Sequence, residues 1–333
     1  MSPDKQAGIW TLALASLQQG VPAILLYVLE SQGSSPGRQG FFMVVNDRGD
    51  MEGSVGGGIM EHKFTEMARD RLQRNDRSLS LRLQVHDKEV AKDRSGMICS
   101  GQQHILLYTF VPDDVATVQA ILHSLQQQRN GTLQLSPAGL AFSPLAPAND
   151  FLFYRHSEED WQYTEKTGYK NRLFIIGGGH CALALSRIMR TMDYYITVVD
   201  HRPDLPTLTL NEAAHEKIIV TDYDELRQCI PAGCGRRYLV VMTQGYRTDD
   251  RAVRALLEKE FRYFGLLGSR TKVGKLLGDY RAEGIPEEYL RKIQAPAGLA
   301  INSRTPEEIA ISIAAAIIGV KNDPGISPAP ASP

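Results

Sequence analysis

The spacing of hydrophobic positions changes several times along the chain and separates predicted strands from predicted helices. An apolar stripe at Ile9, Leu12, Ala13 and Leu17 recurs about every 3.6 residues and predicts an amphipathic helix. Apolar runs predict strands at 23–31, 41–46, 79–85 and 104–110, and helical periodicity predicts helices at 59–74 and 115–129. Residues 1–145 are therefore expected to form a mixed α/β domain.

The second half of the chain, residues 171–321, repeatedly places a helical pattern after an apolar run. Strands are predicted at 173–176, 195–199, 217–221, 238–242 and 263–267, and helices at 249–260 and 271–283. A capping box from Thr305 to Glu308, with Pro306 in the first turn, begins the last helix. Alternating strands and helices favour parallel sheets, because each connection must cross back over the sheet. We therefore predict a Rossmann-like, doubly wound parallel sheet.

Two segments lack this regular pattern. Over residues 146–170 the periodicity is lost, and Pro144 and Pro147 interrupt the chain. We interpret this segment as an inter-domain linker, which would permit an exchange of domains within a homodimer. The last segment, 322–333, contains four prolines and is expected to be a disordered tail.

Composition and charge narrow the classes of function. The 333 residues are 43% hydrophobic and 23% charged, and the formal net charge is −1, so we expect no overall attraction to nucleic acid or to an anionic membrane. No apolar run approaches the roughly 20 residues that span a bilayer. The N-terminus lacks a signal-peptide pattern, and the four cysteines form no closely spaced pair. We therefore expect a cytoplasmic protein with free thiols.

The most informative segment is a glycine turn that joins two of the predicted strands. Gly177, Gly178 and Gly179 follow the first strand directly, and Asp200 ends the second, 23 positions after Gly177. Glycines let the backbone approach a ligand, and the N-terminus of the next helix attracts an anion. This order is typical of a dinucleotide-binding unit, in which Asp200 would accept a ribose hydroxyl. A local interaction between Asp200 and Arg202 is the alternative.

Further polar residues follow other strands of the second half, where a doubly wound sheet binds its ligand. His180 stands in the glycine turn, where it could contact an anionic ligand or act as a general base. Thr243 and Ser269 each follow a predicted strand. Ser269 is expected to cap a helix whose first turn carries Arg270 and Lys272. Cations are unfavourable there beside the helix dipole, so either an anion lies between them or water solvates them.

The first half carries a second glycine cradle. Gly56, Gly57 and Gly58 precede a predicted helix, whose N-terminus can bind an anion. Glu61 lies in the first turn of that helix, where a carboxylate is favourable even without a ligand. Cys99 precedes a strand and is either a reactive thiol or a small buried hydrophobic residue. No spacing of histidines, cysteines and carboxylates defines a metal site.

Together these segments resemble the XdhC/CoxI family, the accessory proteins of xanthine dehydrogenase and related molybdenum hydroxylases. The resemblance covers almost the whole chain. It rests on residues 53–61 and 99–101 in the first half, and on 176–180, 199–203, 241–249, 265–272, 295–299 and 305–310 in the second. The Gly268–Lys272 block and the Thr305–Ala310 block are its most specific motifs.

The resemblance implies a role in maturing a molybdenum enzyme rather than in turning over purines. It implies binding of the molybdenum cofactor (molybdopterin) by the candidate residues named above. It also implies transfer of the sulfurated cofactor to the apo-xanthine dehydrogenase, alongside a cysteine desulfurase. Two positions depart from the family pattern, because Ile59 replaces a cysteine and Gln244 replaces a histidine. An oxidoreductase that uses NAD(H) and a non-catalytic scaffold with an empty Rossmann fold are the alternatives.

Overall fold

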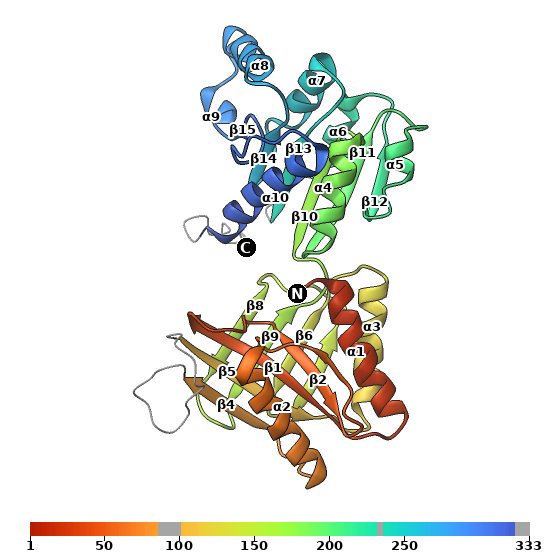
Figure 1. The fold of residues 1–333 in the computed structure, drawn as a ribbon, viewed down its shortest axis with the longest axis vertical. Coiled ribbons are helices and arrows are strands. Elements are labelled where there is room, and N and C mark those ends of the chain that lie inside the picture. Colours follow the sequence, from red (N-terminus) through yellow and green to blue (C-terminus); the bar gives the residue numbers. More distant parts are fainter. Residues whose placement is uncertain (86–100, 232–235, 324–333) are drawn as a thin grey trace. The chain divides into compact units, whose positions relative to one another are not determined.

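The computed structural model describes residues 1–85, 101–231 and 236–323. They fall into two compact units, Met1–Tyr169 and Lys170–Pro333, each with its own core (Figure 1). Cys99 and the expected tail from residue 324 onward lie outside the described residues. Within the described part of the chain, no helix combines the length and the apolarity that a membrane crossing requires.

The first unit is built on a five-stranded antiparallel sheet with the order β3-β2-β1-β5-β4. Its strands are β1 (Ala23–Gly33), β2 (Phe42–Asn46), β3 (Met51–Gly53), β4 (Ser80–Val85) and β5 (Gly101–Thr109). The central strand β1 is buried on both faces, because apolar side chains follow one another along it. The helix α2 (Gly58–Gln73) covers one face through Met60, Phe64 and Ala68.

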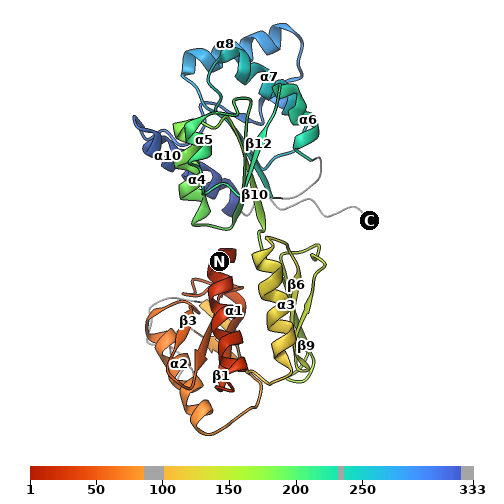
Figure 2. The same ribbon diagram turned by 90° about the vertical axis from the view of Figure 1, so that its right-hand side faces the viewer.

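The opposite face of this sheet packs against two helices and a second sheet (Figure 2). The second sheet has the order β7-β6-β9-β8. Its strands are β6 (Thr132–Ser136), β7 (Gly139–Ser143), β8 (Phe151–Arg155) and β9 (Trp161–Lys166), and the helices are α1 (Pro3–Gln18) and α3 (Asp114–Gln126). Trp10, Tyr27, Val118 and Tyr163 meet in the core between them.

The segment 146–170, expected to be a linker, instead contributes β8 and β9 to the second sheet of the first unit. Phe151 and Phe153 alternate with other residues in β8, as Trp161 and Tyr163 do in β9, which is the period of a half-buried strand. The two prolines that suggested a linker lie in the loop between β7 and β8. The first unit therefore extends to Tyr169, and an exchange of domains within a homodimer stays a prediction.

The second unit contains a six-stranded parallel sheet with the order β12-β11-β10-β13-β14-β15. Its strands are β10 (Asn171–Ile176), β11 (Tyr194–Asp200), β12 (Glu216–Ile219), β13 (Arg237–Val241), β14 (Tyr263–Leu266) and β15 (Ile293–Gln294). Counted within the unit, this order is 3-2-1-4-5-6, as in dinucleotide-binding sheets. The predicted Rossmann-like sheet is confirmed, and its switch point lies between β10 and β13.

Helices cover both faces of the parallel sheet (Figure 2). One face carries α4 (His180–Arg190), α5 (Pro206–Thr209) and α10 (Pro306–Asn322). The other carries α6 (Leu226–Cys229), α7 (Tyr246–Leu256), α8 (Arg270–Ala282) and α9 (Glu287–Leu290). Alternation along β10 separates the two cores. Leu173 and Ile175 lie in the core with α4 and α10, whereas Phe174 and Ile176 lie in the core with α7 and α8.

Candidate functional site

The residues predicted for the second unit lie at the carboxyl ends of its parallel strands. Gly177–Gly179 follow β10, Asp200 ends β11, Thr243 follows β13, and Ser269 and Arg270 follow β14. In a parallel sheet all these ends lie along one edge, where doubly wound folds bind their ligands. Two hydrogen-bonded networks connect the strand ends in this structure. We refer to this region as the strand-end edge.

The glycine turn leaves its backbone accessible at the N-terminus of α4. Gly177 has φ 108°, and a Cβ at this position would lie 2.4 Å from the carbonyl oxygen of Met242, so only glycine fits. A Cβ on Gly179 would meet nothing within 4 Å. Gly179 is also the N-cap of α4, and no side chain caps the first turn, in which His180 is exposed. Uncapped N–H groups of this kind attract anions.

Asp200 is fully buried, and both oxygens of its carboxylate accept hydrogen bonds from within the protein. Oδ2 accepts hydrogen bonds from the Gly178 N–H at 2.7 Å and from Arg202 Nη2 at 2.8 Å. Oδ1 accepts from the N–H and the Nε of Arg202, both at 2.9 Å. Burial alone would raise the pKa of Asp200, but these hydrogen bonds outweigh it and hold the pKa below its ordinary value. A ribose hydroxyl could reach Asp200 only by displacing one of these donors, so the structure forms the local Asp200–Arg202 alternative.

Arg202 extends this network from β11 to the end of β13. Its Nη1 donates to Oε1 of Gln244 at 3.2 Å, and its side chain is 32% exposed. Beside it, Nδ1 of His201 lies 3.1 Å from the hydroxyl of the buried Tyr223 and 3.5 Å from Oδ1 of Asp200. The end of β11 therefore presents a guanidinium held in place from two strands. Gln244 stands where the family resemblance predicts a histidine, and its side-chain oxygen accepts the hydrogen bond from that guanidinium.

A second network joins β13, α7 and α8. Oδ1 of the buried Asp249 accepts a hydrogen bond from the Thr243 N–H at 3.0 Å and one from its hydroxyl at 2.5 Å. Lys272 Nζ forms an ion pair with Oδ2 of Asp249, so its charge at the helix N-terminus is neutralised within the protein. Ser269 caps α8, as predicted, by accepting from the Lys272 N–H at 3.2 Å. Arg270 is exposed and has no ion-pair partner among the described residues.

In the first unit, a carboxylate of the chain itself fills the glycine cradle. Oε2 of Glu61 accepts hydrogen bonds from the Ser54 hydroxyl at 2.5 Å and from the N–H groups of Val55 and Gly57, both at 3.1 Å. The three cradle glycines, Gly56 to Gly58, have φ values of 133°, 77° and 63°, a conformation that glycine favours. Ile59, next to them, is 61% exposed. An external anion would have to displace Glu61 to enter this cradle.

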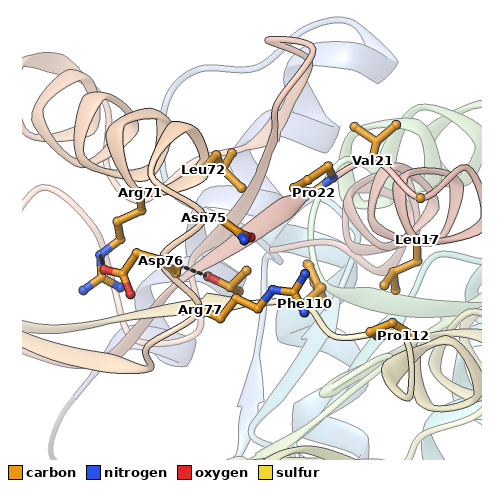
Figure 3. A pocket seen from close by; sticks show the side chains of 12 residues that line it. Leu17, Val21, Pro22, Arg71, Leu72, Asn75, Asp76, Arg77, Phe110 and Pro112 are labelled. Atoms are coloured by element: carbon orange, nitrogen blue, oxygen red, sulfur yellow. Dashed lines mark hydrogen bonds and ion pairs between the residues drawn. The ribbon is translucent and has the colours of Figure 1, made fainter.

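A pocket of about 110 Å³ lies elsewhere in the first unit, between the end of α1, the end of α2 and the loop after β5 (Figure 3). Its walls are partly apolar, with Arg71, Asp76 and Arg77 as charged neighbours. None of the predicted site residues lines it, so it adds nothing to the candidate site. In the described part of the chain, no three histidines, cysteines or carboxylates are grouped as metal ligands would be.

Two family models match the chain. The model described as the XdhC Rossmann domain matches residues 173–317, and the model described as the XdhC and CoxI family matches residues 16–83. A probable xanthine dehydrogenase subunit of Bacillus subtilis (strain 168) is 25% identical over 331 residues, which is 92% of this chain and 96% of that protein. The uncharacterized protein YqeB of Escherichia coli (strain K12) is 25% identical over 324 residues, or 95% of this chain. The chain spans about half the length of YqeB, since the match covers 46% of it.

A solved structure shares the fold. The crystal structure of a xanthine dehydrogenase (BH1974) from Bacillus halodurans has a TM-score of 0.69 to this chain, with 24% identity and coverage of 98% of both chains. At that identity the likeness shows the fold alone. The regions matched by the two family models lie one in each unit, in agreement with the motifs noted in the sequence. The chain therefore belongs to the XdhC and CoxI family.

Proposed function

We propose that this protein is an accessory factor of xanthine dehydrogenase or a related molybdenum hydroxylase, and that it binds and delivers the molybdenum cofactor. Family membership supports an association with this class of enzyme, as does the name of the Bacillus subtilis relative. The molybdenum cofactor is a pterin that carries a phosphate group, so a protein that binds it needs an anion site. In this role the cofactor is a cargo rather than a resident catalytic group.

The observation that carries the proposal is the chemistry of the strand-end edge in the second unit. The uncapped N-terminus of α4, with open space at Gly179, offers N–H groups to an anion. Arg270 adds an exposed positive charge at the start of α8, while the neighbouring Lys272 is neutralised by Asp249. These residues fit the phosphate of the cofactor, and Gly177, His180 and Thr243 complete the edge. The pterin ring would extend from this anchor.

The same geometry argues against an oxidoreductase that uses NAD(H). Recognition of the adenosine ribose in such enzymes needs an acidic side chain that is open to the hydroxyl. Here four donors already occupy the Asp200 carboxylate, and the side chain is fully buried. A scaffold without a ligand, in turn, needs neither the accessible glycine turn nor an exposed cation at the start of α8.

Sulfuration and transfer extend the proposal beyond the second unit. We assign the candidate thiol to Cys99, which lies outside the described residues, with a cysteine desulfurase as sulfur donor and the apo-dehydrogenase as recipient. The Gly56–Gly58 cradle and Glu61 would contribute only if the anion displaced Glu61 from the cradle N–H groups. A homodimer and a cytoplasmic location remain predictions.

The proposal is tested by the content of the purified protein. The protein is produced in a molybdenum-replete host and purified without oxygen. Pterin is measured by mass spectrometry and molybdenum by elemental analysis. We expect near-stoichiometric pterin in the native protein. Arg270→Ala should lower the pterin content about tenfold, because a charge-assisted hydrogen bond is removed. Cys99→Ala should reduce the maturation of the dehydrogenase. Lys275→Ala is the matched control, because Lys275 is exposed further along α8 and stacks on Tyr246.

Two results would contradict the proposal. Bound nicotinamide dinucleotide without pterin would favour the oxidoreductase. A protein that is empty as purified, and that also fails to bind added cofactor, would leave the scaffold. An equal loss of pterin in Arg270→Ala and in Lys275→Ala would remove the assignment of the site to the strand-end edge.

A further inference from the structure

We propose that Arg202 is the ligand-contacting residue at the end of β11, and that it selects ligands bearing a phosphate monoester. The identity of the natural ligand rests on the proposed function, but the phosphate chemistry does not. This assigns the contact to a residue other than Asp200, which the spacing from the glycine turn had indicated. Asp200 instead acts as a positioning residue that orients the guanidinium.

The orientation of Arg202 is set by acceptors on two strands. Its Nε and Nη2 donate to the two oxygens of Asp200 at 2.9 and 2.8 Å, which is a bidentate contact through one edge of the guanidinium. Its Nη1 donates to Gln244, at the end of β13, at 3.2 Å. A guanidinium carries five N–H donors. The three bonds leave one N–H on each terminal nitrogen without a partner in the described part of the chain.

The two charges of the pair differ in their exposure to solvent. Asp200 is fully buried, whereas 32% of the Arg202 side chain is exposed. The N–H of Gly178 further compensates the buried carboxylate. A ligand that approaches from solvent therefore meets the cation before the anion. The two remaining N–H groups lie on the terminal nitrogens, where a pair of phosphate oxygens can be bound.

The chemistry of the ligand follows from this arrangement. A phosphate monoester carries a charge of about −1.5 to −2 at pH 7 and three strong acceptor oxygens, which suits a fixed guanidinium. A free ribose hydroxyl is neutral and needs an open acceptor, which Asp200 does not provide. The phosphate of the molybdenum cofactor and the 2′-phosphate of NADP both have this chemistry. NAD lacks it, because each of its phosphates is esterified within the pyrophosphate bridge.

Two pairs of probes test the inference by titration calorimetry on the full chain. The first pair is 6-hydroxymethylpterin with and without a phosphate monoester, and the second is NADP and NAD. We expect the phosphorylated member of at least one pair to bind about 10-fold to 100-fold more tightly than its partner, as one charge-assisted contact predicts. The pair that shows this preference identifies the source of the phosphate. Arg202→Gln should reduce the preference about tenfold, and the α4 N–H groups and Arg270 would account for any preference that remains.

Two further variants separate ligand contact from folding. Arg202→Lys keeps a positive charge beside Asp200 but loses the fork, so it should fold and retain only part of the preference. Arg187→Gln makes the same change of charge on the exposed surface of α4 and should leave the preference unchanged. Melting temperatures of all variants are measured in parallel.

The outcomes distinguish this inference from the proposed function. A folded Arg202→Gln protein that keeps the full preference for phosphate overturns the inference, and so does a native protein that prefers neither phosphorylated probe. If the preference depends on Arg202 but the purified protein contains no pterin, the inference stands and the role in cofactor delivery fails. If pterin is bound and Arg202→Gln does not reduce its phosphate preference, only the assignment to Arg202 fails.

Discussion

Lys272, in the first turn of α8, forms an ion pair with the fully buried Asp249 of α7. The same carboxylate accepts two hydrogen bonds from Thr243 at the end of β13. One buried charge thus fixes the turn that carries Arg270 against the strand end. The pair also explains how a lysine is tolerated beside the positive end of a helix dipole.

The two members of this pair should not be equivalent. Lys272→Met would leave the Asp249 charge buried without its cation, at a cost of about 3 kcal/mol or more in the free energy of unfolding. Asp249→Asn should cost less, about 1–2 kcal/mol, because Lys272 is partly exposed and can turn to water. Urea denaturation measures both, with the exposed Glu288→Gln as control. A larger loss in Asp249→Asn would contradict this account.

The Asp200–Arg202 network predicts a specific dependence on pH. Because the folded protein holds the pKa of Asp200 below its ordinary 3.8, the carboxylate stabilises the fold at pH values above 3.8. That stabilisation is lost as the pH falls below 3.8 and through the lowered pKa. The difference in unfolding free energy between the native protein and Asp200→Asn should therefore be constant near pH 6 and shrink below about pH 4. A difference that stays constant down to pH 3 would exclude this role.

Tyr27 should be a strong link between the two sheets of the first unit. Its hydroxyl, on β1, donates to Oε2 of Glu165 on β9 at 2.6 Å. Burial raises the pKa of Tyr27 well above its ordinary value, so the hydroxyl remains a donor. Tyr27→Phe keeps the stack on Phe42 but removes this bond, and we expect a loss of about 1.5–3 kcal/mol in chemical denaturation. Tyr154→Phe, at an exposed tyrosine that donates to Asp160, should have a much smaller effect.

Two glycine-to-alanine changes should alter the free energy of unfolding in opposite directions. Gly57 has φ 77° and ψ −177°, a conformation that alanine adopts only with strain, so Gly57→Ala should destabilise the first unit by about 1–3 kcal/mol. Gly274 lies inside α8, and a Cβ there would meet nothing within 4 Å. Gly274→Ala should therefore stabilise the second unit by about 0.5–1 kcal/mol. Thermal melting of both variants checks the signs, and equal signs would refute this explanation.

The segment 146–170 shows where the hydrophobic pattern was insufficient. Its two strands are short and half-buried, and the prolines before them suggested a break in structure. What makes them strands is the pairing of β9 with β6 and with β8 in the folded unit. Such pairing stabilises a short strand but leaves little periodicity over so few residues.

Asp200 and Glu61 show a similar limit for the candidate site. The glycine motifs predicted both residues as site candidates. They did not predict how many hydrogen bonds each carboxylate accepts from within the protein. Arg202 and the cradle N–H groups reach these oxygens only in the folded chain. The nearest signal in the sequence was the Asp-x-Arg spacing, which indicated the ion pair but could not rank it above a ligand contact.

The sequence by itself determined the alternation of strands and helices in the second unit, the two classes of domain and the strand ends that carry polar residues, because periodicity, caps and glycine turns act over a few neighbouring residues. The capping box at Thr305 and Glu308 forms as its local pattern predicts. Only the tertiary structure decided which charges are neutralised inside the protein, as for Lys272 and Asp249, and which remain exposed, as for Arg270. The reason is physical, since an ion pair between residues on different elements depends on burial and distance, and the folded chain alone sets both.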